Sequence, residues 1–255
     1  MKILAFSDVH YDGSKHLMED VLSLCSKGFD LVIVAGDVSA WGRYEEVYHL
    51  LKRISDYSEV AVVAGNHDLW SPRRDVHFEE KLQQFSKASE KAGAHHLIHG
   101  PLKVNGVTIS GVCGWYDESL QVEPPPEHLT CDDRQYVATD LDDWNMVSWF
   151  IKRWKPSKAL ITVTHFLPTV RLLDPNDKTH REASRYQGSD RLMEIPLTAG
   201  SKIHLCGHLH RGPQFAVEKG ILIANVAPHP IVIEAGRGEI KMEAVKNITL
   251  TKPNL

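Results

Sequence analysis

The sequence predicts an α/β protein whose parallel sheet carries a polar site at the carboxyl ends of its strands. Two observations support this prediction: apolar strand segments alternate with amphipathic helical segments, and five strand segments end directly in Asp, Asn or His. The first three ends are evenly spaced, because 29 residues separate Asp8 from Asp37 and 29 separate Asp37 from Asn66. Equal steps of this length are typical of consecutive right-handed βαβ units, in which neighbouring strand ends lie side by side.

The N-terminal half shows the alternation most clearly. Its strand segments consist of small and β-branched apolar residues, which suit strands buried on both faces. Between them, apolar residues recur at helical spacing, and Gly28 and Gly93 are typical helix stops. The predicted elements are strands over 3–7, 31–35, 60–64 and 107–112, and helices over 15–27, 43–55 and 75–92.

The regular alternation stops near residue 117. Nine carboxylates and a proline triplet fall within 117–143, and such a triplet does not fit a helix interior or a central strand. We therefore predict an acidic loop over 117–139, followed by a helix over 140–154. Two interpretations of this loop are open: it caps the site together with Trp115 and Tyr116, or it is a solvated surface loop with Trp115 packed beneath it.

The last part of the chain is predicted to add two further strands that end in His and then to change to short strands. Glycines in the turns between these short strands, at 236 and 238, favour antiparallel pairing. No linker rich in Gly or Ser divides the chain, so we expect a single domain over 1–255. The predicted elements are strands over 160–164, 203–206, 221–226, 231–234 and 239–245, a loop over 166–188, and a short helix that Ser189 caps.

Composition restricts the class of protein. The chain is 42% hydrophobic and 24% charged, which suits a globular core, and no apolar run approaches the length of a membrane span. Four scattered cysteines without a C-x-x-C pair predict reduced thiols and a cytoplasmic location. The net charge of −4 and the lack of a basic stripe with interleaved aromatics argue against a nucleic-acid track.

The residues at the strand ends form a donor set that suits transition metals. Carboxylate oxygens, an amide oxygen and imidazole nitrogens without a thiolate favour Mn²⁺, Fe or Zn²⁺. A lone His or Asp is more often structural than a ligand, but five coincident placements at strand ends are hard to explain in that way. Seven donors are too many for one tetrahedral ion and suit two ions that share a bridge. The candidates are Asp8, His10, Asp37, Asn66, His165, His208 and His210.

These residues occur in ordered motifs: Asp8-x-His10, Gly36-Asp37, Gly65-Asn66-His67-Asp68, His165 and Gly207-His208-x-His210. The order resembles that of the calcineurin-like metallophosphoesterases, and it covers residues 8 to 210. The resemblance implies a four-layer α/β/β/α sandwich of two mixed sheets flanked by helices, with a dinuclear metal centre at the strand ends. It also implies hydrolysis of phosphoester bonds by a hydroxide that bridges the two ions.

The same resemblance implies a role for each motif residue. His67 is implied as the proton donor or charge stabiliser at the leaving group, and Asn66 and His67 as substrate contacts. Asp68 either orients His67 or is a carboxylate at a helix start, and both interpretations are open. By resemblance, Asp8, His10 and His210 hold the first ion, Asn66, His165 and His208 hold the second, and the catalytic Asp37 bridges them.

The motifs specify the superfamily better than the substrate. The Asp-Arg-Gly of the phosphoprotein phosphatases is missing after Asp37, and His67 occupies the position at which the lipid A precursor hydrolases have Arg. We therefore expect a small soluble phosphodiester or phosphomonoester as substrate, with nucleotides among the candidates. A protein phosphatase or nuclease of the same superfamily is the alternative. A metal-binding scaffold for protein interactions, with little or no turnover, is the alternative of another class.

Basic residues in the 166–188 loop are candidates for further substrate contacts. Arg171, Arg181 and Arg185 suit a second phosphate or a ribose. Pairing with nearby acids of the same chain explains them equally well.

Overall fold

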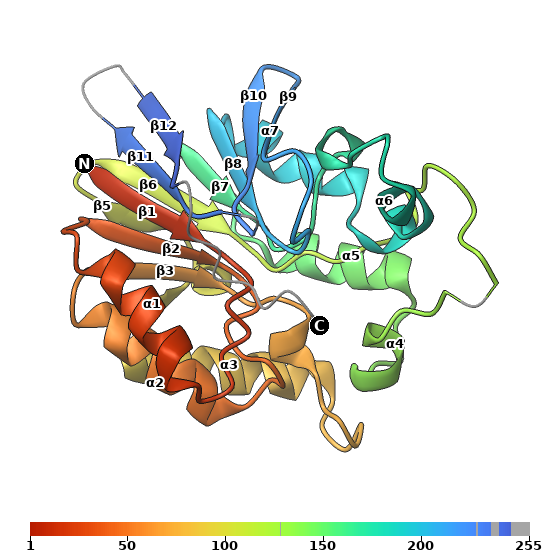
Figure 1. Cartoon of the computed structure of the whole chain (residues 1–255), viewed down its shortest axis with the longest axis horizontal. Helices are drawn as coiled ribbons and strands as arrows, with labels where there is room; N and C mark the ends of the chain where they lie inside the picture. Colours follow the sequence, from red (N-terminus) through yellow and green to blue (C-terminus); the bar gives the residue numbers. More distant parts are fainter. Residues whose placement is uncertain (128, 228, 236–239, 246–255) are drawn as a thin grey trace.

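Two six-stranded mixed sheets lie face to face at the centre of the protein, and helices cover their outer faces (Figure 1). The computed structural model describes residues 1–127, 129–227, 229–235 and 240–245. The four-layer α/β/β/α sandwich that the resemblance implied is confirmed.

The first sheet has the strand order β12-β11-β1-β2-β3-β4. Its strands β1 to β4 are parallel, β11 is antiparallel to β1, and β12 is antiparallel to β11. Their bounds are β1 Lys2–Phe6, β2 Leu31–Ala35, β3 Glu59–Val63, β4 His95–His96, β11 Ile231–Ala235 and β12 Ile240–Ala244.

The second sheet has the strand order β5-β6-β7-β8-β10-β9. Its four central strands are parallel, and β5 and β9 are antiparallel at the two edges. Their bounds are β5 Leu102–Val104, β6 Val107–Gly111, β7 Ile161–Val163, β8 Ile203–Cys206, β9 Phe215–Glu218 and β10 Ile221–Asn225.

Helices α1, α2 and α3 cover the outer face of the first sheet, and α5 and α7 lie along the second (Figure 1). None of the helices in the described residues is long and apolar enough to span a membrane. The α-helices are α1 Lys15–Cys25, α2 Tyr44–Ser55, α3 Phe78–Ala92, α4 Asp133–Tyr136, α5 Asp143–Arg153, α6 Lys178–Glu182 and α7 Glu194–Ala199. The 3-10 helices are His67–Leu69, Leu97–His99, Val170–Leu172, Ser184–Tyr186 and Asp190–Met193.

The central strands are apolar on both faces because each face has its own core. In β2, Ile33 packs into the core between the two sheets, whereas Val32 and Val34 pack into the core beneath the helices. The same alternation holds in β1, where Ile3 and Leu4 point to opposite cores. This double burial explains why the strands appear in the sequence as continuous apolar runs.

The structure corrects the predicted pairing of the C-terminal strands. β11 and β12 are antiparallel as expected, although the turn glycines 236 and 238 lie outside the described residues. The strand predicted over 221–226 does not join them: β10 is parallel to β8 and antiparallel to β9, an exposed strand that the sequence analysis missed. Closeness in sequence was misleading here, because the chain crosses from one sheet to the other after β10.

Two predicted loops also contain short helices. The 117–139 segment includes α4, and the 166–188 segment includes α6. The helix predicted over 140–154 begins at Asp143, because the carboxylate of Asp142 caps it by accepting a hydrogen bond from the backbone N–H of Asn145.

Candidate metal centre

The polar strand ends of both sheets meet at one place. Asp8, Asp37 and Asn66 follow the parallel strands β1, β2 and β3 of the first sheet. His165 follows β7, and His208 follows β8, in the second sheet. Since the carboxyl ends of parallel strands lie at one edge of a sheet, the two facing sheets bring these side chains together.

One donor set contains Asp8, His10 and His210, and one atom from each lies within 4.8 Å of the others. Oδ1 of Asp8 lies 3.1 Å from Nε2 of His210 and 3.9 Å from Nε2 of His10. The two imidazole nitrogens are themselves 3.2 Å apart. These three side chains therefore point their donor atoms at a common position.

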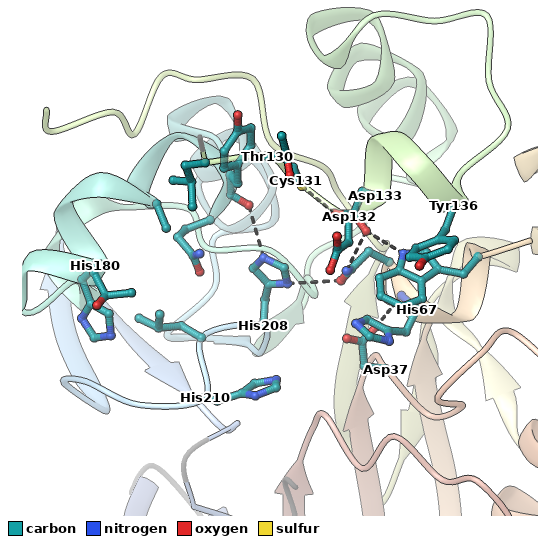
Figure 2. A pocket seen from close by; sticks show the side chains of 18 of the residues that line it. Asp37, His67, Thr130, Cys131, Asp132, Asp133, Tyr136, His180, His208 and His210 are labelled. Carbon is teal, nitrogen blue, oxygen red and sulfur yellow. Dashed lines mark hydrogen bonds between the residues drawn. The ribbon is translucent and has the colours of Figure 1, made fainter. Parts of the chain in front are cut away.

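A second donor set contains Asp37, His165 and His208, again within 4.8 Å of one another. The amide oxygen of Asn66 joins this set, because Oδ1 lies 2.9 Å from Nε2 of His165 and 3.1 Å from Nδ1 of His208. Figure 2 shows Asp37 and His208 at the wall of a cavity into which this set opens.

Asp37 belongs to both sets. Its Oδ2 lies 3.7 Å from Nε2 of His10 and 3.5 Å from Nε2 of His165. One carboxylate between two clusters of oxygen and nitrogen donors fits a pair of divalent transition-metal ions such as Mn, Fe or Zn. The donor set of this structure thus suits the ions that the resemblance implied.

Hydrogen bonds to the backbone orient two of the imidazoles. Nδ1–H of His165 donates to the carbonyl of Ala35 over 2.9 Å, which turns Nε2 toward the donor set. Nε2–H of His208 donates to the carbonyl of Tyr186 over 3.2 Å, so that its lone pair is on Nδ1. Partners of this kind select the tautomer and hold the ring of a metal-binding histidine.

The backbone adopts left-handed conformations at four of the candidate ligands. The φ angles are 57° at Asp8, 47° at His10, 50° at Asp37 and 67° at His208. Such angles are unfavourable for residues with a Cβ and are found where packing and function require them. Close packing also explains a glycine of the motifs, because a Cβ on Gly65 would collide with the carboxylate of Asp37.

The candidate histidines differ in pKa: nearby carboxylates raise it in some, and burial lowers it in others. Burial opposes a charge on His165, but the carboxylates of Asp37 and Asp8 raise its pKa to about 10. Burial lowers the pKa of His10 to about 4 and that of His208 to about 3, so both are neutral at physiological pH. Burial favours the protonated form of Asp37, yet His165 and His67 hold the pKa of this carboxyl well below its usual value.

His67 lies beside both donor sets. Its ring stacks on Trp70 with centroids 3.5 Å apart and meets His10 edge-on at 4.3 Å. Nδ1–H donates to the carbonyl of Ala40 over 3.0 Å, which leaves Nε2 for a proton or a ligand. The backbone N–H of His67 donates to Oδ1 of Asp37 over 2.9 Å and so connects the two residues.

Asp68 lies in the 3-10 helix His67–Leu69. This position agrees with the interpretation of Asp68 as a carboxylate at a helix start. Its carboxylate accepts hydrogen bonds from the backbone N–H groups of Gly65, Ser39 and Val38 at 2.9, 2.8 and 3.2 Å. It therefore ties the loop after β2 to the loop after β3. Burial, with the charge of Asp37 in addition, raises the pKa of Asp68 to about 7.

A cavity of about 1010 Å³ opens from the donor sets. Trp41, Trp70 and Tyr136 form an aromatic wall on one side, with ring centroids 4.8 to 5.9 Å apart. Other parts of the cavity are lined by residues 129–133 of the acidic loop and by Thr179, His180, Ala183, Tyr186 and Gln187 (Figure 2).

Both interpretations of the acidic loop are therefore partly correct. The residues from 129 to 133 border the cavity, whereas Trp115 and Tyr116 are buried beneath the loop.

The arginines of the 166–188 loop pair with acids of the same chain. Arg171 pairs with Glu218 at 2.8 Å, Arg181 with Glu123 at 3.2 Å, and Arg185 with Glu118. None of the three belongs to the described residues that line the cavity. The structure thus supports the pairing interpretation over direct substrate contact.

Among the polar residues of the cavity that the sequence analysis missed, two lie beside candidate ligands. Arg211 lines it and follows directly after His210, a position that the motif could have indicated. Asp133 is buried and accepts a hydrogen bond from Nδ2 of Asn66 over 2.9 Å. Nothing in the sequence distinguishes this carboxylate from the other eight around it.

Comparison with known proteins agrees with the geometry. The fold and the paired donor sets are those of a metal-dependent hydrolase, and the family model described as calcineurin-like phosphoesterase matches residues 1–212. The chain belongs to this family. No curated protein matches it in a sequence search.

Two solved structures share the fold at low sequence identity. A phosphopantetheinyl hydrolase from Mycobacterium tuberculosis is 21% identical over 88% of each chain, with a TM-score of 0.66. A dimetal phosphatase from Danio rerio is 11% identical over 96% of this chain and 95% of its own, with a TM-score of 0.55. At these identities the comparison shows the fold and leaves the substrate open.

Proposed function

We propose that the protein hydrolyses a small phosphodiester or phosphomonoester with the help of two divalent transition-metal ions. The observation that carries this proposal is the position of Asp37, whose Oδ2 lies between Nε2 of His10 and Nε2 of His165 at 3.7 and 3.5 Å. A carboxylate shared by two donor sets is what a dinuclear centre requires of its bridging ligand. Family membership supports the hydrolase class on independent grounds.

The residues present would hold the ions in two groups. Asp8, His10 and His210 would bind one ion, Asn66, His165 and His208 the other, and Asp37 both. When bound, such ions neutralise phosphoryl oxygens and lower the pKa of water.

His67 is placed to serve the leaving group. Its Nδ1–H is fixed on the carbonyl of Ala40, so that the proton on Nε2 is the one free to move. An alkoxide leaves poorly without a proton, which is the need that a general acid meets. Stacking on Trp70 holds the ring in this orientation.

The cavity supports a substrate larger than a bare phosphate. Pockets that bind whole small molecules occupy roughly 300–1000 Å³, and this cavity of about 1010 Å³ lies at the upper end. Trp41 and Tyr136 offer aromatic faces to a planar group, which keeps nucleotides among the candidates. The similarity to a phosphopantetheinyl hydrolase adds phosphopantetheinyl esters to the set that merits testing.

The test is a screen with several metals. The purified protein is loaded with Mn²⁺, Fe²⁺ or Zn²⁺ and assayed on nitrophenyl phosphates, nucleotides, cyclic nucleotides, phosphopantetheinyl esters, phosphopeptides and single-stranded DNA. We expect metal-dependent turnover of at least one small ester. Best turnover of phosphopeptides or DNA would instead support a protein phosphatase or nuclease, and two bound ions without turnover would support a scaffold. The cytoplasmic location and the single domain stay predictions.

A further inference from the structure

Asp133 connects the acidic segment to the second donor set. It begins α4, 67 residues beyond Asn66 in the chain, and its side chain is 4% exposed. Oδ1 accepts two hydrogen bonds, one from Nδ2 of Asn66 over 2.9 Å and one from Nε1 of Trp70 over 2.7 Å. Figure 2 shows Asp133 at the wall of the cavity, on the same side as Tyr136 and His67.

The contact decides which end of the Asn66 amide faces the histidines. An amide side chain has an oxygen that accepts and an NH₂ group that donates, and the two ends have almost the same shape. A carboxylate can only accept, so Asp133 selects the orientation in which NH₂ points toward itself. Oδ1 of Asn66 then points at Nε2 of His165 and Nδ1 of His208, at 2.9 and 3.1 Å. In the reversed orientation the NH₂ group would stand there, and an amide nitrogen is no metal ligand.

The fold by itself does not require a carboxylate at this position. A buried carboxylate destabilises a protein unless hydrogen bonds or charges compensate for the lost water. Here Oδ1 has two donors, and the near neighbour of Oδ2 is Sγ of Cys131 at 3.5 Å, a weak partner. The hydrogen bond from the amide of Asn66, a candidate ligand, gives the buried carboxyl group of Asp133 a role that packing alone does not.

We propose that Asp133 is a positioning residue of the metal centre: it holds the amide of Asn66 with its oxygen toward the second ion. The part of the acidic segment from 129 to 133 thereby belongs to the metal centre as well as to the wall of the cavity. The inference depends on the proposed function, because it takes Asn66 to be a metal ligand.

Three variants distinguish a role of Asp133 in positioning Asn66 from a role in folding of the protein. Asp133→Leu removes the acceptor at similar volume and leaves the amide of Asn66 free to turn. Asp133→Asn retains an oxygen where Oδ1 lies, so both hydrogen bonds can form. Asp140→Asn changes an exposed acid directly after this segment and is the matched control.

The measurement is Mn²⁺ binding by titration calorimetry, together with electron paramagnetic resonance of the loaded proteins. Loss of a partner that orients a ligand typically weakens metal binding by about 10–100-fold. We expect this loss for one of the two ions in Asp133→Leu, with the spectrum changing from a coupled pair to an isolated ion. Asp133→Asn should bind both ions within about 3-fold of the wild type, and Asp140→Asn should be unchanged.

A reciprocal exchange keeps the inference testable if Asp133→Leu does not fold. Asn66→Asp alone places two carboxylates against each other, whereas Asn66→Asp with Asp133→Asn restores one donor and one acceptor. We expect the double variant to bind the second ion more tightly than Asn66→Asp alone, as a coupling energy between neighbours.

Several results would overturn the inference. Two tightly bound ions in Asp133→Leu, or equal loss in Asp133→Leu and Asp133→Asn, would remove the positioning role. So would a lower melting temperature of the metal-free protein with unchanged metal affinity, or an exchange that restores nothing. If the wild type takes up fewer than two ions, the proposed function fails by itself, whatever Asp133 does.

Discussion

Oδ2 of Asp37 lies 3.5 Å from Nε2 of His165, although the two residues follow strands of different sheets. Both side chains are buried, and burial opposes charge on each. Their mutual attraction is stronger: the pKa of His165 is raised to about 10, and the pKa of Asp37 is held well below its usual value. In the metal-free protein the pair is therefore ionised, and an ion that binds Nε2 of His165 must displace its proton.

Removing the charge of Asp37 should cost the centre at least one of its two ions. We expect Asp37→Asn to bind at most one ion where the wild type binds up to two, because a neutral amide bridges two cations poorly. Elemental analysis after loading with Mn²⁺ or Zn²⁺ measures this directly. The exposed Asp140→Asn is the control for a charge change of the same size. The same metal content in wild type and Asp37→Asn would refute the bridging role.

His67→Ala should affect substrates according to their leaving groups. A general acid contributes roughly 10²–10⁴-fold, or about 3–5 kcal/mol of transition-state stabilisation, when the leaving group is an alkoxide. A nitrophenolate leaves without a proton, so its esters should lose much less. The measurement is kcat/KM on alkyl and nitrophenyl esters, with metal content determined alongside and exposed His16→Ala as control.

Other results for His67→Ala would assign this residue a different role. Equal loss on both ester types would indicate that His67 stabilises phosphoryl charge or positions the substrate. A fall in metal content would make it a ligand, since one of its nitrogens lies within 4.8 Å of donor atoms of His10 and Asp37.

The candidate ligands could be predicted because each is fixed by its own strand. A parallel strand that ends in Asp8 or His165 delivers that side chain to the edge of the sheet, whatever the loops do. Local pattern therefore sufficed to bring the candidate donors to one place, whereas the four layers followed from the resemblance. The resemblance added which donors share an ion, and the distances around Asp37 agree with it.

The walls of the cavity could not be predicted, because they depend on contacts between distant loops. Asp133 reaches Asn66 across 67 residues, and Arg181 finds Glu123 across 58. In the sequence these charges look alike, and only the folded loops separate a buried carboxylate from a solvated one. The pairing of β10 failed for a related reason, since its partner β8 is not its neighbour in the chain.

The protein should not act as a processive nuclease. The loop arginines 171, 181 and 185 are paired with glutamates, so these three charges are offset by acids and not free for a phosphate backbone. We expect weak binding to long duplex DNA and far slower digestion of it than of the best small ester. Tight binding that declines steeply with salt, or digestion at a matching rate, would contradict this prediction.

His204 offers a test of acid stability away from the metal centre. It is fully buried in β8, where Nδ1 and Nε2 each lie 2.9 Å from a threonine hydroxyl, of Thr162 and Thr164. Thr164 donates its hydroxyl proton to the carbonyl of Phe166, so it accepts from Nε2–H, and Thr162 donates to Nδ1. Both nitrogens are satisfied by a neutral ring, and burial lowers the pKa of His204 to about 3.

Acidification should therefore destabilise the metal-free protein in part through His204. Between its ordinary pKa of 6.5 and the folded value of about 3, the unfolded chain binds a proton that the folded chain does not, so stability falls as pH falls. The loss from this group amounts to about 2 kcal/mol between pH 6.5 and pH 4.5. His204→Gln can bond both threonines without titrating, and we expect its free energy of unfolding in urea to fall by about 2 kcal/mol less over that interval. Acidic side chains titrate in both proteins and cancel in the comparison. Parallel pH profiles for wild type and His204→Gln would show that the ring is not neutral in the fold.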